Sequence, residues 1–215
     1  MNVKREPTPA QSEPTAAPVR TTKAGQSEAT RAALVEAARP LFAERGYAAV
    51  ATEEIVRAAG VTRGALYHHF AGKEDLFAAV YEQVEAELVA EIGQVATVAA
   101  DPLDALHRGA ARFLEACRRP EVQRITLIDA PSVLGWERWR EIGVSYGFGL
   151  IEEVLRAGME QGVIETQPLR PLTHLLLGAM DEAAMLVARS DDPELREQVA
   201  RSIDRYLDTL APRSS

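Results

Sequence analysis

The stretch AGVTRGALYHHF at residues 59–70 decides how the N-terminal part of this chain folds. Gly60 ends one helical segment, and Thr62 is a good N-cap for the next. Leu66 and Phe70 are spaced i, i+4, so they form the apolar side of a helix over 63–70. The residues before this stretch predict a helix over 53–59, with Thr52 as its N-cap. Two short helices joined by a tight turn are a helix-turn-helix.

Helical spacing continues on both sides of this unit. A helix over about 27–45 is indicated by Leu34, Ala38 and Phe42 on one face, and Gly46 stops it. Pro40 lies inside, which predicts a kink or a late helix start. Further helices are predicted at about 73–98, 102–118, 120–129, 136–161, 168–189 and 193–210. The only β-leaning stretch is 125–128, where a buried helix fits its surroundings better than a lone strand, so the fold is predicted to be all-α.

The residues of this region resemble a known family. Residues 41–47 (LFAERGY), 54–55 (EI), 59–70 and 72–76 (GKEDL) closely resemble the DNA-binding domain of the tetracycline-repressor-like (TetR) family of transcriptional regulators, over about residues 27–80. The resemblance implies a three-helix reading head, a larger helical domain with a cavity for a small effector, and a dimer. Pro40 departs from the usual pattern of the first helix.

Composition places the chain among ordinary globular proteins. Hydrophobic residues make up 47% and charged residues 26% of the 215 residues, and no apolar run approaches the ~18 residues that cross a bilayer. No apolar stretch follows Lys4 and Arg5, so a secretory signal is not expected and we expect a cytoplasmic protein without membrane contact. Cys117 is the single cysteine, which excludes an internal disulfide.

Charge is distributed unevenly along the chain. The total is −8, but residues 1–25 carry +2, residues 26–73 carry +1 and residues 74–215 carry −11. We interpret 1–25, rich in proline, as a disordered tail, 26–73 as the DNA-binding domain and 74–215 as the effector-binding and dimerisation domain. Arg20 and Lys23 of the tail are expected to add electrostatic affinity for DNA.

The candidate DNA contacts lie around the second helix of the helix-turn-helix. Caps at helix N-termini favour phosphate, an arginine can bond guanine in the major groove, and small residues allow close approach. Helical geometry turns Tyr67 and His68 outward when Leu66 and Phe70 face the core. Each of these residues could instead only cap, pack or be solvated. The candidates are Thr52, Thr62, Arg63, Gly64, Ala65, Tyr67, His68, His69 and Lys73.

The C-terminal part has no recognisable catalytic pattern, so binding is its expected chemistry and no cofactor is expected. His68 and His69 are adjacent on a helix and diverge, which argues against a metal site. Trp136, Trp139 and Tyr146 recur at helical spacing, and such a stripe lines either a core or a pocket. The candidate effector-binding residues are Phe113, Cys117, Thr126, Asp129, Trp139, Tyr146 and His174.

The last two helices carry long apolar stripes that need partners. They either complete the chain's own core or, as the resemblance implies, pair with a second subunit through about 168–210. Such a homodimer supplies the two-fold symmetry of a palindromic operator in double-stranded DNA.

The resulting functional prediction is a DNA-binding transcriptional regulator, a repressor released from its operator by a small, partly apolar effector, and not an enzyme. One rival is a constitutive DNA binder, which the −11 charge of residues 74–215 opposes. Another is an enzyme with a DNA-binding head, which lacks a convergent set of titratable residues. Activation instead of repression is also open.

Overall fold

The computed structural model describes residues 23–190 and 192–212, and all their regular elements are helices. The prediction of an all-α fold is therefore confirmed for these residues. Residues 1–22 lie outside the described residues, and so does the predicted DNA contact of Arg20. Among the described residues, no helix is both long and apolar enough to cross a membrane.

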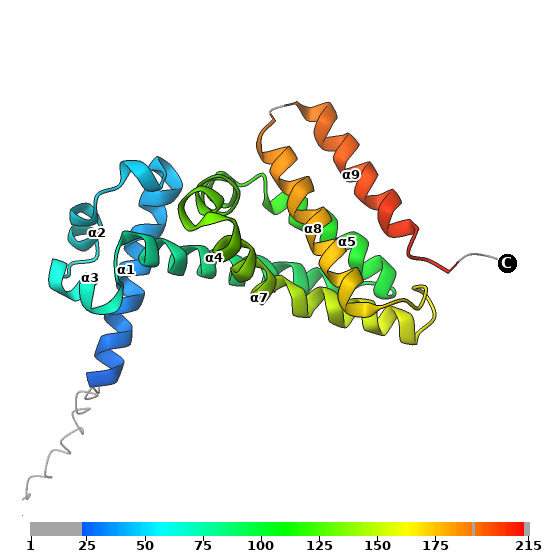
Figure 1. Cartoon of the computed structure of the whole chain (residues 1–215), viewed down its shortest axis with the longest axis horizontal. Helices are drawn as coiled ribbons and strands as arrows, with labels where there is room; N and C mark the ends of the chain where they lie inside the picture. The colour runs from blue at the N-terminus through cyan, green and yellow to red at the C-terminus, as the bar shows by residue number, and fades with distance from the viewer. Residues whose placement is uncertain (1–22, 191, 213–215) are drawn as a thin grey trace, which may run out of the picture.

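Three helices and a short 3-10 turn form the head of the molecule (Figure 1). These elements are α1 (Lys23–Arg45), η1 (Tyr47–Ala49), α2 (Thr52–Ala58) and α3 (Arg63–His69). Helix α1 begins at Lys23, four residues before the predicted start. Residues 23–25, which were predicted to belong to the tail, are therefore part of the helix.

Pro40 does not delay the start of α1, so the late helix start that the sequence offered as one alternative is wrong. The helix runs through it, although proline cannot donate the usual backbone hydrogen bond. Leu34, Ala38 and Phe42, on the same helix, are fully buried. Their packing compensates for the lost bond, because tertiary contacts supply most of a helix's stability.

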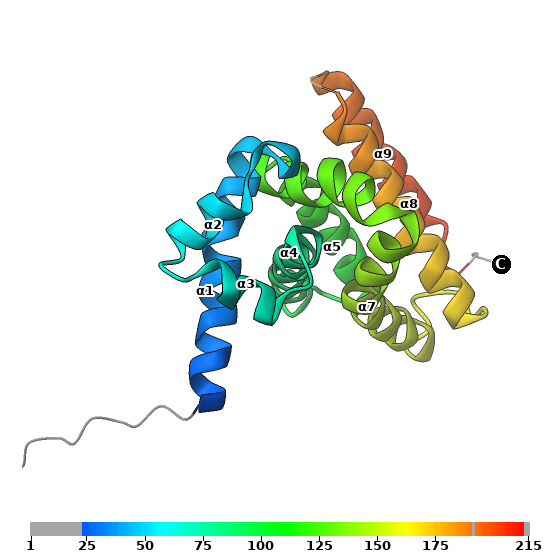
Figure 2. The same ribbon diagram turned by 60° about the vertical axis from the view of Figure 1, so that its left-hand side comes forward.

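Helix α4 (Lys73–Ala96) runs from the head into the helical body, as Figure 1 shows. The body contains α5 (Pro102–Ala116), α6 (Pro120–Val122), the π-helix η2 (Gln123–Asp129), α7 (Ala130–Glu160), α8 (Leu169–Ala188) and α9 (Pro193–Asp208). Asp101 and Asp192 cap α5 and α9, each followed by a proline at the first helical position. Helices α8 and α9 lie side by side at the end away from the head (Figures 1 and 2).

Residues 120–134 form one continuous helical run instead of a helix that stops at 129. The break comes at Gly135, whose φ of 75° is accessible at little cost only to glycine, and α7 continues beyond it. The β-leaning stretch 125–128 lies in the π-helix. The prediction of a helix there is confirmed, and the helix is of the wider π type. A π-helix adds a residue to a turn and often marks a functional site.

The core of the head is continuous with part of the body. One cluster of buried side chains joins Phe42 and Leu66 of the head to Ile125 and Trp139 of the body, with α4 between them. A second cluster fills the space between α5, α7, α8 and α9. The proposed division between 26–73 and 74–215 stays a prediction, because the apolar packing crosses residue 73.

Candidate nucleic-acid interface and effector cavity

The helix-turn-helix is built by local signals. Gly60, with a φ of 66°, makes the turn after α2. The Thr62 hydroxyl accepts a hydrogen bond from the Ala65 amide at 3.2 Å, so this predicted N-cap is confirmed. Leu66 and Phe70 are buried at 0% and 5% exposure and fix α3 against the head.

Burial of these two residues turns the opposite side of α3 to solvent. Arg63, Gly64, Tyr67 and His68 are exposed, and Tyr67 retains 47% of its accessible surface. Ala65 and His69 are half-buried. Arg63 pairs with Glu53 of α2 at 2.8 Å, and its guanidinium lies 5.6 Å from the Tyr67 ring centre. The exposed face thus carries one arginine, one phenol and one imidazole.

Thr52 does not cap α2, contrary to the prediction. The N-cap is Ala51, whose backbone is extended, and Thr52 is the first helical residue. Its hydroxyl lies 3.2 Å from the Glu53 carboxylate, to which it donates a hydrogen bond. The prediction of a phosphate contact at Thr52 therefore loses its capping argument.

Lys73 is not the free charge that the sequence suggested. Its ammonium donates hydrogen bonds to the carbonyl oxygens of Tyr47 and Val50, both at 2.9 Å, and lies 4.0 Å from the Tyr47 ring centre. Partial burial lowers the pKa of this ammonium. Lys73 therefore ties the start of α4 to the η1 turn, and a phosphate contact through its third hydrogen stays a prediction.

A cavity of about 110 Å³ lies inside the body, between α4, α5, α7 and α8. Its wall is mainly apolar, with Leu88 and Ile92 from α4 and Leu106 and Phe113 from α5. Gly143 and Gly147 of α7 also line it, and a Cβ at Gly147 would come within 3.2 Å of Leu177 on α8. These glycines thus allow α7 to approach a neighbouring helix beside the cavity.

The structure divides the predicted effector-binding residues. Phe113, Thr126 and Trp139 lie on the cavity wall. Four others lie elsewhere: Cys117 is buried in the core that joins head and body, Asp129 contacts the head, Tyr146 borders a groove beside α1, and His174 is exposed against Phe148. Helical spacing on α7 could not predict that only Trp139 lines the cavity, because spacing does not show which neighbouring helix each side chain meets.

Three charged residues of the cavity wall were missed by the sequence reasoning: Glu85, Arg140 and Asp181. Glu85 follows Tyr81 and Val84 on the buried side of α4 and is only 8% exposed. A carboxylate within an apolar stripe is rare unless it has a partner or a function, so this position carried a usable signal. Burial, and then the nearby Asp181 charge, raise the pKa of Glu85 to about 8. Burial raises that of Asp181 to about 6.

The π-helix links this cavity to the head. Thr126 of η2 lines the cavity, and Asp129, three residues later, accepts a 2.7 Å hydrogen bond from the Tyr47 amide. Gly46, with a φ of 78°, lets the chain pass this close, since a Cβ there would lie 3.3 Å from the Asp129 carboxylate.

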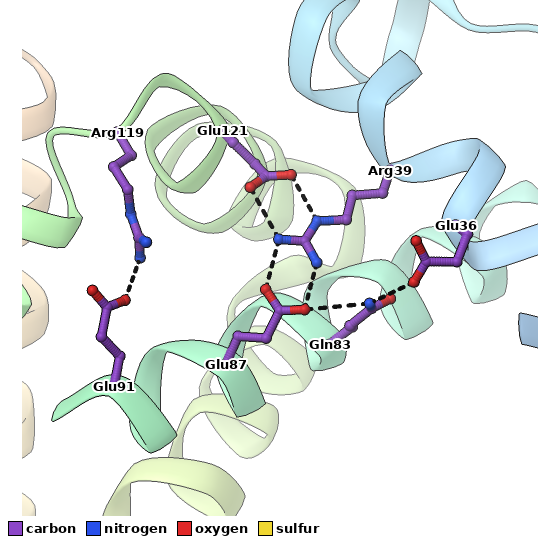
Figure 3. A network of polar contacts seen from close by, with 7 residues as sticks. All are labelled: Glu36, Arg39, Gln83, Glu87, Glu91, Arg119 and Glu121. Atoms are coloured by element: carbon purple, nitrogen blue, oxygen red, sulfur yellow. Dashed lines mark hydrogen bonds and ion pairs between the residues drawn. The ribbon is translucent and has the colours of Figure 1, made fainter. Parts of the chain in front are cut away.

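A second link between head and body is an ionic network around Arg39 of α1 (Figure 3). Its guanidinium binds Glu87 of α4 at 2.6 and 2.7 Å and Glu121 of α6 at 2.7 and 3.0 Å. Gln83 joins Glu87 to Glu36, which extends the network along α1 and α4. One arginine thus holds three helices, one from the head and two from the body.

Most apolar residues of α8 and α9 complete the chain's own core, which weakens the sequence argument that they need a second subunit. Leu176, Val199 and Ile203 are among those buried within the chain. Leu175 and Leu186 of α8 are the exceptions, with 65% and 44% exposure. They are eleven residues apart, three helical turns, and therefore share one face.

Among the described residues, no group of three histidine, cysteine, aspartate or glutamate side chains is arranged to hold a metal ion.

Comparison with known proteins gives matches in both parts of the chain. Residues 34–80 match the family model of bacterial regulatory proteins of the tetR family, and residues 103–210 match that of the tetracyclin repressor-like C-terminal domain. The Transposon Tn10 TetC protein of Escherichia coli is 29% identical over 151 residues, which cover 70% of this chain and 76% of that protein. The HTH-type transcriptional repressor KstR2 of Mycobacterium tuberculosis is 37% identical over 83 residues, 39% of this chain and 42% of that protein.

A solved structure covers nearly the whole chain. The crystal structure of a TetR-family transcriptional regulator from Pectobacterium atrosepticum superposes with a TM-score of 0.79 and 32% identity, over 90% of this chain and 100% of that one. Members of this family bind DNA operators and small effectors and are dimeric. The exposed α3 face and the internal cavity agree with both activities. The chain belongs to the TetR family of DNA-binding transcription regulators.

Proposed function

We propose that this protein is a repressor that binds a palindromic operator as a homodimer and releases it when a small, partly apolar effector enters the cavity. The observation that carries the proposal is the solvent-facing side of α3, together with a mainly apolar cavity between the helices of the body. The repressor among the relatives supports this direction of regulation. Such a protein acts in the cytoplasm, beside the DNA.

The proposed DNA contacts are energetically accessible. Arg63 must leave Glu53 to reach a guanine, and an exposed ion pair of this kind contributes little because solvent screens it. A bidentate contact with guanine is worth about 1–3 kcal/mol, so the exchange favours DNA. Tyr67 and His68 lie on the same exposed side and can reach a phosphate or a thymine methyl group.

Dimerisation through α8 would cover the exposed Leu175 and Leu186. A two-fold interface brings each patch against the same patch of the partner, and it sets two α3 helices at a fixed spacing. A charge placed in this patch should separate the subunits without disturbing either core.

Coupling between cavity and head has two routes. Helix α4 begins in the head at Lys73 and passes the cavity with Tyr81, Glu85 and Leu88. The π-helix lines the cavity with Thr126 and binds the head through Asp129. An effector that prefers one position of these elements shifts the spacing of the two reading heads and lowers operator affinity.

The experiment begins with selection of bound sequences from random DNA, followed by sedimentation of the complex and a screen for compounds that release it. We expect a palindromic site, two subunits per site and a log K against log[salt] slope of about −5 to −7, for three or four phosphate contacts per subunit. Leu175→Asp should give a monomer that binds DNA weakly. A wild-type monomer bound to a single half-site would refute the proposal.

A further inference from the structure

The polar groups of the cavity are concentrated where the first half of α4 passes it. Glu85, Arg140 and Asp181 are its charged side chains among the described residues, and the hydroxyls of Tyr81 and Thr126 lie on the same wall. Beyond them the wall contributed by α4 becomes apolar, with Leu88, Val89 and Ile92 among others. The cavity therefore presents one polar region and one apolar region to a ligand.

The charges in the polar region do not balance when Glu85 is ionised. Arg140 binds Asp181 at 2.5 Å, so the single guanidinium of the cavity is already paired with a carboxylate. Glu85 lies within reach of the Tyr81 hydroxyl, which donates a 3.4 Å hydrogen bond to the Trp139 carbonyl, and no ion pair between Glu85 and a described cation is found. A buried carboxylate without a cation is costly when ionised, which is the physical origin of its raised pKa. When Glu85 ionises, the site therefore lacks one positive charge.

Thr126 provides a second, independent observation. Its hydroxyl is buried, with the residue 4% exposed, and has no hydrogen-bonding partner among the described residues. Buried hydroxyls in proteins nearly always have a partner, so this one is suited to a ligand atom in the cavity that it lines. The same wall carries the indole of Trp139, and aromatic faces attract cations.

We propose that the effector is a small amphiphilic amine, whose ammonium group binds Glu85 and the Thr126 hydroxyl while its apolar part lies among Leu88, Ile92 and Phe113. This inference rests on the proposed function, because it takes the cavity as the effector site. An anion would meet two carboxylates and an arginine that is already paired. A neutral ligand supplies no counter-charge, so Glu85 would stay protonated beside it and would give it no ionic contact. The volume of about 110 Å³ suits a short alkyl chain or, with small movements of the wall, one ring, since an apolar cavity of about 150 Å³ holds benzene.

Binding of such a cation displaces a proton from Glu85. The carboxyl is mostly protonated at pH 7 in the free protein, because its pKa is about 8. The ammonium enters with its own proton, the Glu85 O–H bond breaks, and the released proton goes to the buffer. The titratable groups that act on or are influenced by Glu85 are Tyr81 on α4, Cys117 at the end of α5, Tyr146 on α7 and Asp181 on α8, and Arg140 on α7 acts on Tyr81 and Asp181.

The test uses the full chain without DNA and three probes of one shape but different charge. Calorimetry should show that benzylamine binds at least tenfold more tightly than benzyl alcohol, and that benzoate binds more weakly than both. Glu85→Gln should weaken benzylamine at least tenfold and change benzyl alcohol less than twofold. Glu82→Gln, the same change one turn earlier on α4 and outside the cavity, should leave benzylamine affinity unchanged.

A second measurement does not depend on the variant. Calorimetry of the wild-type protein in buffers of different ionisation enthalpy should show net proton release, approaching one proton per benzylamine, at pH 7, and none with benzyl alcohol. Equal affinity for the amine and the alcohol, or amine binding without proton release, would overturn the inference.

Operator release is measured separately, so that the two proposals can fail independently. Benzylamine that binds through Glu85 but does not release the operator supports the amine site and refutes only the proposed effector response. A neutral or anionic compound that releases the operator equally from wild-type and Glu85→Gln protein would refute the amine inference and leave the repressor proposal intact.

Discussion

The ionic network around Arg39 should contribute measurably to the stability of the joint between head and body. In Figure 3 its guanidinium lies between Glu87 and Glu121, and its side chain is only 18% exposed. Arg39→Met keeps an unbranched aliphatic side chain that can pack in a similar way. It removes the positive charge and the guanidinium N–H donors. The change leaves the two carboxylates beside each other without a shared cation.

The expected cost follows from the geometry. An exposed ion pair contributes about 0.2–1 kcal/mol, and the double bidentate geometry places each pair at the upper end of that range. Repulsion between Glu87 and Glu121 adds a little more. These carboxylates are 52% and 36% exposed, so solvent screens both terms. We expect a loss of about 2 kcal/mol in the free energy of unfolding, or roughly 4–8 °C in melting temperature for a chain of this size.

Urea and thermal unfolding at one fixed protein concentration measure this loss, since dimerisation would otherwise shift the apparent stability. Arg39→Lys retains the charge but not the fork, so it should recover only part of the loss. In the double variant Arg39→Met/Glu121→Gln, the second change should cost less than it does alone, because the pair is already broken.

The effect should also depend on pH. Arg39 lowers the pKa of Glu87 below its usual value near 4.5, so this stabilisation is present above pH 4.5 and is lost as the pH falls through the lowered folded value. The difference between wild type and Arg39→Met should therefore shrink in acid. A loss below about 0.5 kcal/mol at pH 7, or full recovery with Arg39→Lys, would refute the reasoning.

Four further outcomes are expected. Tyr67→Ala should weaken the specific DNA complex by about 1–3 kcal/mol in a fluorescence-anisotropy titration, with an unchanged melting temperature, and equal affinity would contradict a contact by the phenol. Lys73→Met should lower the melting temperature, because two backbone carbonyls lose their donor; a variant as stable as wild type that loses only DNA affinity would instead support a phosphate contact. Asp129→Ala should leave effector affinity in the free protein nearly unchanged but reduce effector-induced operator release, since the Tyr47 amide loses its acceptor; release as efficient as in wild type would exclude this route. Raising the pH from 6 to 9 should cost wild type ~2–3 kcal/mol of unfolding free energy, because folding raises the Glu85 pKa to about 8 and this stabilisation is lost as the pH rises through that value; Glu85→Gln should flatten the profile, and an equal slope in both proteins would contradict the raised pKa.

Short-range patterns in the sequence were sufficient to predict most of the helices and the helix-turn-helix of the head. The helical spacing of Leu66 and Phe70, the Thr62 cap and the glycine at 60 all act within a few residues, so their outcome could be predicted without knowing the rest of the fold. The same holds for the Asp-Pro starts of α5 and α9. The prediction failed locally at Thr52, where Ala51 takes the cap position although it has no capping side chain.

Contacts between distant parts of the chain were decided only by tertiary structure. Lys73 binds carbonyls of η1 more than twenty residues earlier, and Asp129 binds an amide 82 residues away. Trp139 lines the cavity and Tyr146 does not, although both lie on the same helix, because Tyr146 borders a groove formed with α1 and α4 instead. A side chain's role depends on which neighbour it meets, and packing angles between helices set that choice.

The sequence alone therefore determined the helices, the helix-turn-helix and the outward direction of Tyr67, since periodicity and capping act along the chain. Tertiary structure decided which polar groups became buried together. Glu85, Arg140 and Asp181 come from three helices and meet only when α4, α7 and α8 pack around the cavity. Their altered pKa values and their charge imbalance arise from removal of water at that meeting point, which no local pattern encodes.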